Sequence, residues 1–263
     1  MDGVNLDGFA LPVKKLKGTD PVETLDLSVK KLGVASAVVI AFLIGVNGGL
    51  TSIDLSGNEL CGIWTDGYSK QQGTYTAEGI TAIADALRVN GGLTSLNLSY
   101  NQLCGLDRDG RGTYTAEGIT AIADTLRVNG SLTSVMIRGN KLGDEGWGAI
   151  FAAICGNKDS KIMSMDASSE NIGPAGVKLI AEALRTSVTG GLTVANLMRN
   201  HLDVESAKML AEVAKQKGIS LCGIRRDQST ADFSKQNLKP PDAILLASDL
   251  SQAVVTGALT KIE

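Results

Sequence analysis

Histidine is almost missing from this sequence, and its scarcity excludes most of the common catalytic arrangements. The 263 residues include a single histidine, His201, with no cysteine close to it in the chain. No Ser/His/Asp or Cys/His group can be argued around it, and neither a phosphate-binding glycine loop nor paired metal ligands at helical spacing occur. The sequence therefore predicts a protein that is not an enzyme and that uses no metal and no cofactor.

Cysteine and basic residues are also few. Four cysteines are too few for a disulfide scaffold in a chain of this length. The net charge of -3 and the pI near 5.3 leave no basic stripe for phosphates, so nucleic acid is not expected as a partner. The first residues lack the basic and apolar regions of a secretory signal, so we expect cytoplasmic residence.

Aromatic residues make up only 4% of the chain, whereas 43% of it is hydrophobic. This composition is typical of a large aliphatic core, and we expect one elongated domain. The longest apolar run, residues 34–46, is shorter than the roughly 20 residues that a membrane-spanning helix needs. We therefore expect no membrane span.

What the sequence does contain is a repeated pattern of leucines that ends in an asparagine. Residues 93–103 show apolar side chains at Leu93, Leu96, Leu98 and Leu103, with Asn101 before the last. The alternation predicts a short strand with one buried face, followed by a turn in which the asparagine bonds backbone groups. Good copies begin at Leu50, Leu132 and Leu192, and weaker copies at Val22 and Ile162.

Helical patterns separate these strands. Residues 77–91 place apolar side chains at Ile80, Ile83, Ala84 and Leu87, which form one face of a helix. Residues 115–130, 174–185 and 204–218 repeat the pattern. The basic unit of strand and helix is about 28 to 30 residues long, in the upper part of the range for leucine-rich repeats.

A unit of this length with a full helix resembles the ribonuclease-inhibitor-like subclass of leucine-rich repeat proteins. This subclass includes Ran GTPase-activating proteins and the sensor domains of NOD-like receptors, and the resemblance covers nearly the whole chain from Val22 on. It implies an α/β solenoid, a curved horseshoe with a parallel β-sheet on the concave face and α-helices on the convex face. It also implies that binding other proteins is the usual activity.

Three regions follow from the register. Residues 1–21 form an N-terminal cap, and residues 22–218 are repeats with insertions at 62–75 and 105–114. Residues 219–263 are irregular repeats, and the last residues match the start of a strand. We therefore expect either a fragment of a longer array or a final strand left as a sheet edge.

The paired insertions are the first candidate binding surface. Each leaves the carboxyl end of a strand, where ligands of open parallel sheets tend to bind. They carry residue types that are common in interfaces, and the candidates are Trp64, Asp66, Tyr68, Tyr75, Asp107, Arg108, Asp109 and Arg111. Surface insertions tolerated without a role remain the alternative. The segment from Asp107 resembles a calcium loop but puts an arginine at a ligand position, so no metal is expected.

Two other surfaces remain open as candidates. The concave sheet offers Tyr100, Arg138 and Arg199, with a plain solvated sheet as the alternative. In the first helix Val38 and Phe42 stand where later helices are polar. Either residues 1–20 cover this face, or it is a docking patch for a partner or for a second copy of the chain.

Cys61 and Cys104 occupy the same position in neighbouring repeats, at a spacing that would permit a disulfide. We expect two buried thiols instead, because cytosolic cysteines stay reduced.

The sequence thus predicts a protein-protein interaction scaffold or recognition module whose partner it does not identify. One alternative is a GTPase-activating protein, for which Arg108 or Arg111 is the comparable loop residue, by analogy of fold alone. Another is a structural subunit of a larger assembly.

Overall fold

The computed structural model describes residues 3–68 and 70–263. The chain divides into two compact units, the first comprising Met1–Leu142 with Asp159–Lys161 and the second comprising Gly143–Lys158 with Ile162–Glu263. One elongated domain was expected, but the boundary between the units falls within the repeats. Because a repeat packs mainly on its neighbours, repeat arrays can divide in this way.

The first unit is built on a parallel sheet whose strands follow the predicted register. Its four strands lie in the order β3 (Thr24–Asp26), β4 (Ser52–Asp54), β7 (Ser95–Asn97) and β8 (Ser134–Met136). The central residues of neighbouring strands are aligned and form one aliphatic row, which consists of Leu25, Ile53, Leu96 and Val135. This row confirms the repeats read from the sequence.

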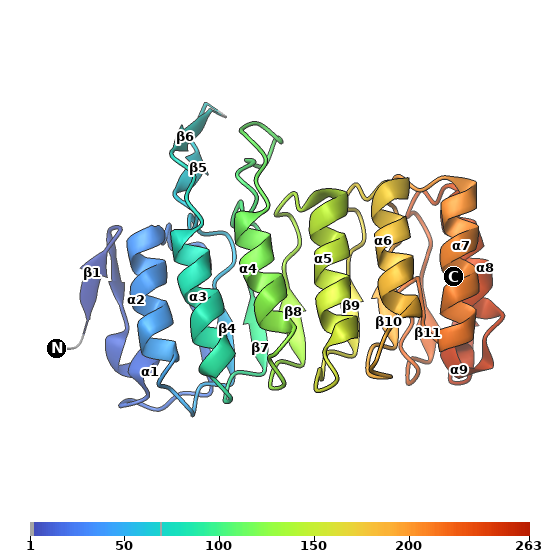
Figure 1. Cartoon of the computed structure of the whole chain (residues 1–263), viewed down its shortest axis with the longest axis horizontal. Helices are drawn as coiled ribbons and strands as arrows, with labels where there is room; N and C mark the ends of the chain where they lie inside the picture. The colour runs from blue at the N-terminus through green and yellow to red at the C-terminus, as the bar shows by residue number, and fades with distance from the viewer. Residues whose placement is uncertain (1–2, 69) are drawn as a thin grey trace. The chain divides into compact units, whose positions relative to one another are not determined.

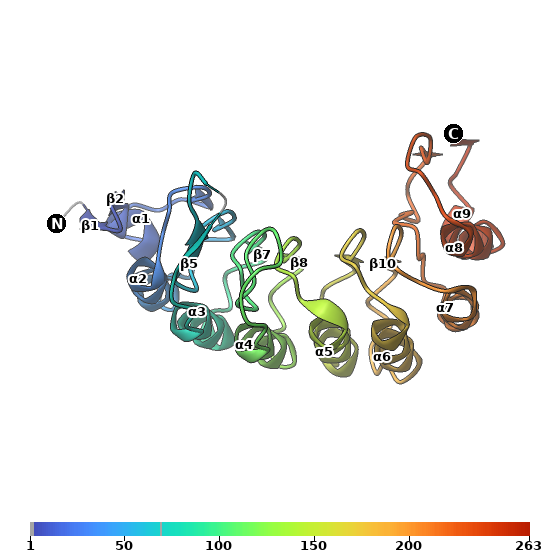
Figure 2. The same ribbon diagram turned by 90° about the horizontal axis from the view of Figure 1, so that it is seen from above.

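Three helices of the first unit lie side by side along one face of this sheet (Figures 1 and 2). They are α2 (Val34–Ile44), α3 (Glu78–Val89) and α4 (Glu117–Leu126). In α3 the predicted apolar face is buried, with Ile80, Ile83 and Leu87 no more than 1% exposed. Strand, turn and helix thus alternate as an α/β leucine-rich repeat requires.

An N-terminal hairpin of β1 (Val4–Leu6) and β2 (Phe9–Leu11), followed by α1 (Val13–Lys17), packs at the two ends of α2. Asp7 Oδ2 accepts the N–H of Gly33 at 2.9 Å, and the Asn47 amide donates to the carbonyl of Leu16 at 3.0 Å. The outer face of α2 stays open, with Phe42 75% exposed. The prediction that this face is covered is wrong for residues 3–20, because they bond to the helix ends instead, and residues 1 and 2 lie outside the described part of the chain.

The second unit carries the helices α5 (Gly143–Gly156), α6 (Pro174–Arg185), α7 (Val204–Lys217), α8 (Pro240–Leu250) and α9 (Ala253–Thr256). Its parallel strand pairs are β9 (Ser164–Asp166) with β10 (Val194–Asn196) and β11 (Thr230–Ala231) with β12 (Lys261–Ile262). Successive helices from α5 to α8 pack on one another. The helices predicted at 174–185 and 204–218 are confirmed.

Residues 220–224 contribute one β-bridge to the second unit, between Val194 and Ser220. The carboxylate of Asp249, from α8, accepts the N–H groups of Leu221 at 2.8 Å and Cys222 at 2.9 Å. Since these donors are already bonded, they are not available to a strand ladder.

Buried asparagines hold the turns after the strands, as the pattern predicts. Asn140 donates to the carbonyls of Leu98 at 3.0 Å and Ile137 at 2.7 Å, and its Oδ1 accepts the N–H of Asn101 at 2.7 Å. Each such side chain joins its own turn to the preceding repeat, and Asn58 and Asn200 make equivalent bonds. The repeats are therefore linked by neutral amides as well as by aliphatic packing.

Candidate functional site

Both insertions leave the same end of the first unit and project beyond its helices (Figure 1). The first forms an antiparallel hairpin of β5 (Ile63–Thr65) and β6 (Gln71–Gly73), and the second closes through a bridge between Leu106 and Gly112. The Gln71 amide donates to the carbonyl of Gly105 at 3.5 Å, so the two insertions touch. They form one surface rather than two separate loops.

Glycines close the necks of the two insertions in the same way. A Cβ on Gly73 would lie 2.1 Å from the carbonyl oxygen of Gly62, and a Cβ on Gly112 would lie 2.3 Å from that of Gly105. Both Gly73 and Gly112 also have a positive φ. Only glycine permits this close approach of backbones.

Asp66 and Asp107, two of the predicted binding residues, organise these loops internally. Asp66 Oδ1 accepts the N–H groups of Tyr68 and Lys70 at 2.9 Å each, and these bonds hold the pKa of Asp66 below its ordinary value. Asp107 Oδ1 accepts those of Asp109 at 3.0 Å and Arg111 at 2.8 Å. Asp107 is only 1% exposed. These carboxylates shape the insertions from within, and Asp107 in particular offers little surface to a partner.

Tyr75 and its counterpart Tyr114 connect neighbouring repeats. The Tyr75 hydroxyl donates to the carbonyl of Leu103 at 2.9 Å, and the Tyr114 hydroxyl donates to that of Leu142 at 2.8 Å. Burial raises the pKa of Tyr75 above its ordinary value. The geometry gives Tyr75 a bridging position in the fold.

The structure brings Tyr100 and Arg108 together in a pocket of about 410 Å³ in the first unit. We call it the edge pocket, and its lining is Gly57, Tyr100, Gln102, Arg108 and Gly139. Tyr100 is 48% exposed, and its ring lies so close to Gly139 that a Cβ there would be 2.3 Å from Cε1 of the ring. The tyrosine is thus held in place by backbone.

Polar atoms in the edge pocket are left open for a ligand. In the part of the chain that the structure describes, the Arg108 side chain makes no ion pair, whereas Arg111 pairs with Asp109 at 3.2 Å. The buried Oε1 of Gln102 has no hydrogen-bond partner among these residues. Because that oxygen is shielded from solvent, only the N–H donors of the amide can be offered to a ligand.

Trp64 lines a second pocket of about 400 Å³, together with Asp7, Lys31, Gly33, Val34, Glu59 and Gly62. The indole is 40% exposed and packs against Gly73. Burial raises the pKa of Glu59, although the nearby Lys31 lowers it. We call this cavity the Trp64 pocket; its lining is mixed in charge.

The remaining predicted residues are scattered. Tyr68 is 89% exposed at the tip of the first insertion. Arg138 is exposed after β8, and Arg199 is exposed in the second unit at the repeat position that Tyr100 holds in the first. Neither arginine lines the edge pocket.

The predicted apolar patch is real as a surface feature. Val38 and Phe42 line a groove of about 400 Å³ between α2 and α3, with Ala41, Gly45, Val46, Ala82, Ala86 and Val89. None of the residues that the structure describes covers this groove, and Val38 and Phe42 are 37% and 75% exposed.

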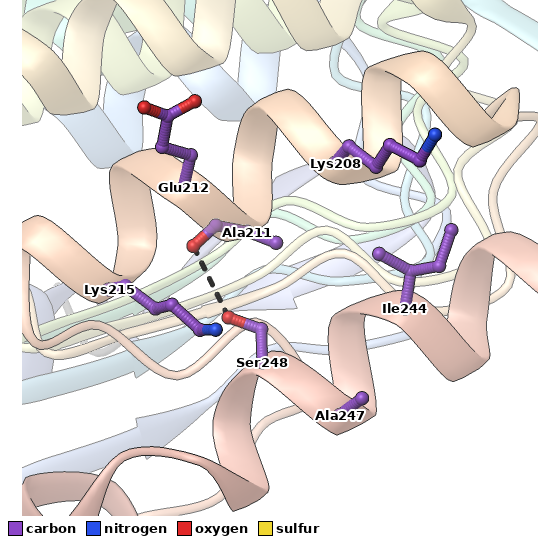
Figure 3. Close-up of a pocket in the computed structure, with 7 residues that line it drawn as sticks. All are labelled: Lys208, Ala211, Glu212, Lys215, Ile244, Ala247 and Ser248. Carbon is purple, nitrogen blue, oxygen red and sulfur yellow. Dashed lines mark hydrogen bonds between the residues drawn. The ribbon is translucent and has the colours of Figure 1, made fainter.

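A further groove, of about 490 Å³, lies in the second unit between α7 and α8 (Figure 3). Lys208 and Lys215 flank a floor of Ala211, Ile244 and Ala247, while Glu212 points away from α8 (Figure 3). Lys208 already pairs with Glu205 at 3.0 Å. None of the residues singled out from the sequence lines this groove.

The expected chemistry of the cysteines is confirmed. Cys61 and Cys104 are buried and not disulfide-bonded, and burial raises the pKa of each thiol to about 12.

Among residues 3–68 and 70–263, no cluster of three or more His, Cys, Asp or Glu side chains is arranged to hold a metal. Within the same residues, no helix is both long and apolar enough to span a membrane.

Gln102 and Glu59 were missed by the sequence reasoning. Both directly follow a turn asparagine, in Asn101-Gln102 and Asn58-Glu59, at the edge from which the insertions leave. The repeat register contained this signal, because residues at the same repeat position line the same edge.

Comparison with known proteins supports the repeat. The family described as Leucine Rich Repeat matches residues 92–110, which contain β7, the Asn101 turn and part of the second insertion. No curated protein matches the chain. The ribonuclease-inhibitor-like subclass stays a prediction, with which the full helices are compatible.

Solved structures with some similarity include leiomodin-1 actin-binding site 2, at 16% identity and a TM-score of 0.40, covering 78% of this chain and 87% of that one. The tropomodulin C-terminal domain of Caenorhabditis elegans is 15% identical with a TM-score of 0.41, and the match covers 66% of this chain and 90% of that one. A Bacteroides fragilis protein is 12% identical with a TM-score of 0.33, with coverages of 80% and 68%. At these values the similarities identify no partner for this chain.

Proposed function

We propose that the chain, whose residues 92–110 match the family described as Leucine Rich Repeat, is a non-enzymatic protein-binding module. Its contact surface is the inserted edge of the first unit, which we define as the edge pocket together with Trp64 and Tyr68. The observation that carries this proposal is the meeting of Tyr100, from a repeat turn, with Arg108, from an insertion. Tyrosine, tryptophan and arginine are the residue types that most often dominate binding energy at protein interfaces.

The strands themselves offer less to a partner. Asp26 Oδ1 accepts the N–H of Ser28 at 2.8 Å, and Asp54 Oδ1 accepts that of Ser56 at 2.8 Å. Asn97 does the same for Ser99 at 3.1 Å. Because these side chains turn their own backbone, they are less free to bond a partner. These internal hydrogen bonds favour the inserted edge, rather than the face of the sheet, as the binding surface.

Selection from a random 16-residue peptide library on the immobilised protein tests the proposal. We expect enrichment on the wild type and its loss on a variant carrying Tyr68→Ser, Tyr100→Ser and Arg108→Ser. Serine is compatible with the backbone at position 100, because Ser169 holds the same repeat position at φ 59°.

The matched control carries Val188→Ser, Arg199→Ser and Leu250→Ser, three exposed positions in the second unit. It should enrich the same peptides as the wild type. Absence of enrichment on the wild type, or equal enrichment on the inserted-edge variant, would contradict the proposal.

Regulation of a small GTPase is a second candidate, favoured by one observation. Arg108 has no ion pair in the described part of the chain, so its guanidinium is available to a nucleotide phosphate, whereas Arg111 is paired with Asp109. Stimulated GTP hydrolysis that falls to background with Arg108→Ala but not with Arg111→Ala would support it. No stimulation of any small GTPase by the wild type would end it.

A further inference from the structure

We propose that the edge pocket receives the carboxylate of an aspartate or glutamate side chain on the partner. This inference rests on the proposed function, since it names the group that the inserted edge recognises. The lining contains one ionisable cation, Arg108, and no acidic residue. A ligand group of negative charge therefore meets its counter-ion there without a like charge in the pocket wall.

The polar groups of the pocket are matched to an acceptor-rich ligand. Arg108 presents a planar fork of N–H donors, the Tyr100 hydroxyl presents one donor, and the Gln102 amide nitrogen presents two. A carboxylate has two oxygens that accept such bonds, and a guanidinium can bond both at once. The pocket thus offers donors from three side chains to one anion.

The walls leave room for this group to approach. Gly57 and Gly139 contribute no side chain to the lining, and a volume of about 410 Å³ accommodates an acidic side chain with part of its backbone. The ring of Tyr100 rests on Gly139, so the hydroxyl is positioned before a ligand arrives. Such preorganisation reduces the ordering cost of binding.

Arg111 provides an internal comparison within the same loop. Its side chain is engaged with Asp109 at 3.2 Å, and its N–H is bonded to Asp107 at 2.8 Å. It does not line the pocket. Recognition of a carboxylate is therefore assigned to Arg108, and Arg111 serves as the matched control.

The experiment uses the full chain and the random peptide library in three parallel selections, on wild type, Arg108→Glu and Arg111→Ala. We expect aspartate and glutamate to be enriched at one position of the peptides selected on wild type and on Arg111→Ala. On Arg108→Glu, lysine and arginine should replace them at that position. Circular dichroism confirms that all three proteins are folded.

Synthetic peptides then measure the effect. Replacing the enriched glutamate by glutamine should weaken binding about tenfold or more on wild type, because a charge-assisted hydrogen bond is lost. The same replacement should have little effect on Arg108→Ala. Comparing peptides with free and amidated C-termini separates a side-chain carboxylate from a terminal one.

Two results would overturn the inference while leaving the proposed function intact. One is enrichment of peptides that carry no acidic position on wild type. The other is binding that depends on the free C-terminus and not on the acidic side chain. If no peptide binds the wild type, the proposed function itself fails.

Discussion

The two units of this protein hold their repeat turns with different chemistry. In the first unit the amides of Asn58 and Asn140 bond the backbone of successive turns. In the second unit Asn200 continues this pattern, but beyond it the bonding groups are the carboxylates of Asp242 and Asp249, both from α8. Neutral amides give way to ionisable acids that are 4% and 0% exposed.

A second difference concerns the edge of each unit. Tyr100 and Arg199 hold the same repeat position, yet only Tyr100 has an insertion beside it to form a pocket. The turn geometry that Tyr100 and Arg199 share supports the fold, whereas Arg108 and the inserted loop that carries it create a site next to Tyr100.

The largest effect should come from breaking the asparagine linkage in the first unit. Asn140→Ala leaves four buried backbone bonds unmade, to Asn101, Leu103, Leu98 and Ile137. We expect a loss of about 3 to 5 kcal/mol in unfolding free energy, measured by urea denaturation. Lys30→Ala is the control at the same turn position and should cost under about 1 kcal/mol.

The neck of the second insertion is the next test. Gly112→Ala would place a Cβ 2.3 Å from the carbonyl oxygen of Gly105, at a φ of 118°. We expect a cost of about 2 to 4 kcal/mol from strain and overlap. Gly110→Ala, in the same loop at φ 82° with open space around it, should cost only about 1 kcal/mol. Equal effects in thermal unfolding would show that the close approach is unimportant.

A smaller effect is expected at the bridging tyrosines. Tyr75→Phe and Tyr114→Phe each remove one hydrogen bond to the next repeat, so we expect about 1 kcal/mol of destabilisation from each. Tyr68→Phe, at an exposed tip, is the control and should leave the unfolding midpoint unchanged. Denaturation of the three variants in parallel distinguishes bridging from surface tyrosines.

The smallest effect concerns Asp249 in the second unit. It should appear only as a change with pH in the contribution of this residue to stability. Burial raises the pKa of Asp249 above its ordinary value of 3.8. Ionisation of Asp249 is then disfavoured in the folded state. The contribution of Asp249 to the unfolding free energy is therefore complete below pH 3.8 and is lost as the pH rises through the folded-state pKa.

The unfolding free energy of wild type minus that of Asp249→Asn should therefore decrease between acidic and neutral pH. Val188→Ser, at an exposed position without an ionisable side chain, should leave the pH dependence of stability unchanged. A difference that grows with pH would contradict the direction of the shift.

Much of the fold was predictable because its information is local and periodic. The spacing of Leu50, Asn58 and Leu60 fixes which side chains enter the core and which amide holds the turn. A second set of asparagines was present but was missed. The motif Asn-Gly-Gly-Leu at 47–50 and 90–93 marks the turns from helix to strand, where Asn47 and Asn90 bond backbone groups.

The site was harder to predict because it depends on non-local contacts. That Tyr100 meets Arg108 follows from the loop turn around buried Asp107 and from the closed neck at Gly112, neither of which is set by the repeat period. The same holds for Asp249, whose partners Ser220 and Cys222 lie 29 and 27 residues earlier in the chain. Both Tyr68 and Tyr75 lie in the first insertion, and the sequence alone did not show that Tyr75 bonds the next repeat whereas Tyr68 is exposed.

The most direct test compares Tyr100→Ala with Arg199→Ala, two substitutions at the same repeat position in different units. The dissociation constant of a peptide selected on the wild type is measured for each variant by isothermal titration calorimetry. We predict that Tyr100→Ala weakens binding about tenfold or more, as expected for a residue that dominates an interface, and that Arg199→Ala leaves it unchanged. Equal weakening by both variants, or by Arg199→Ala alone, would contradict binding at the inserted edge.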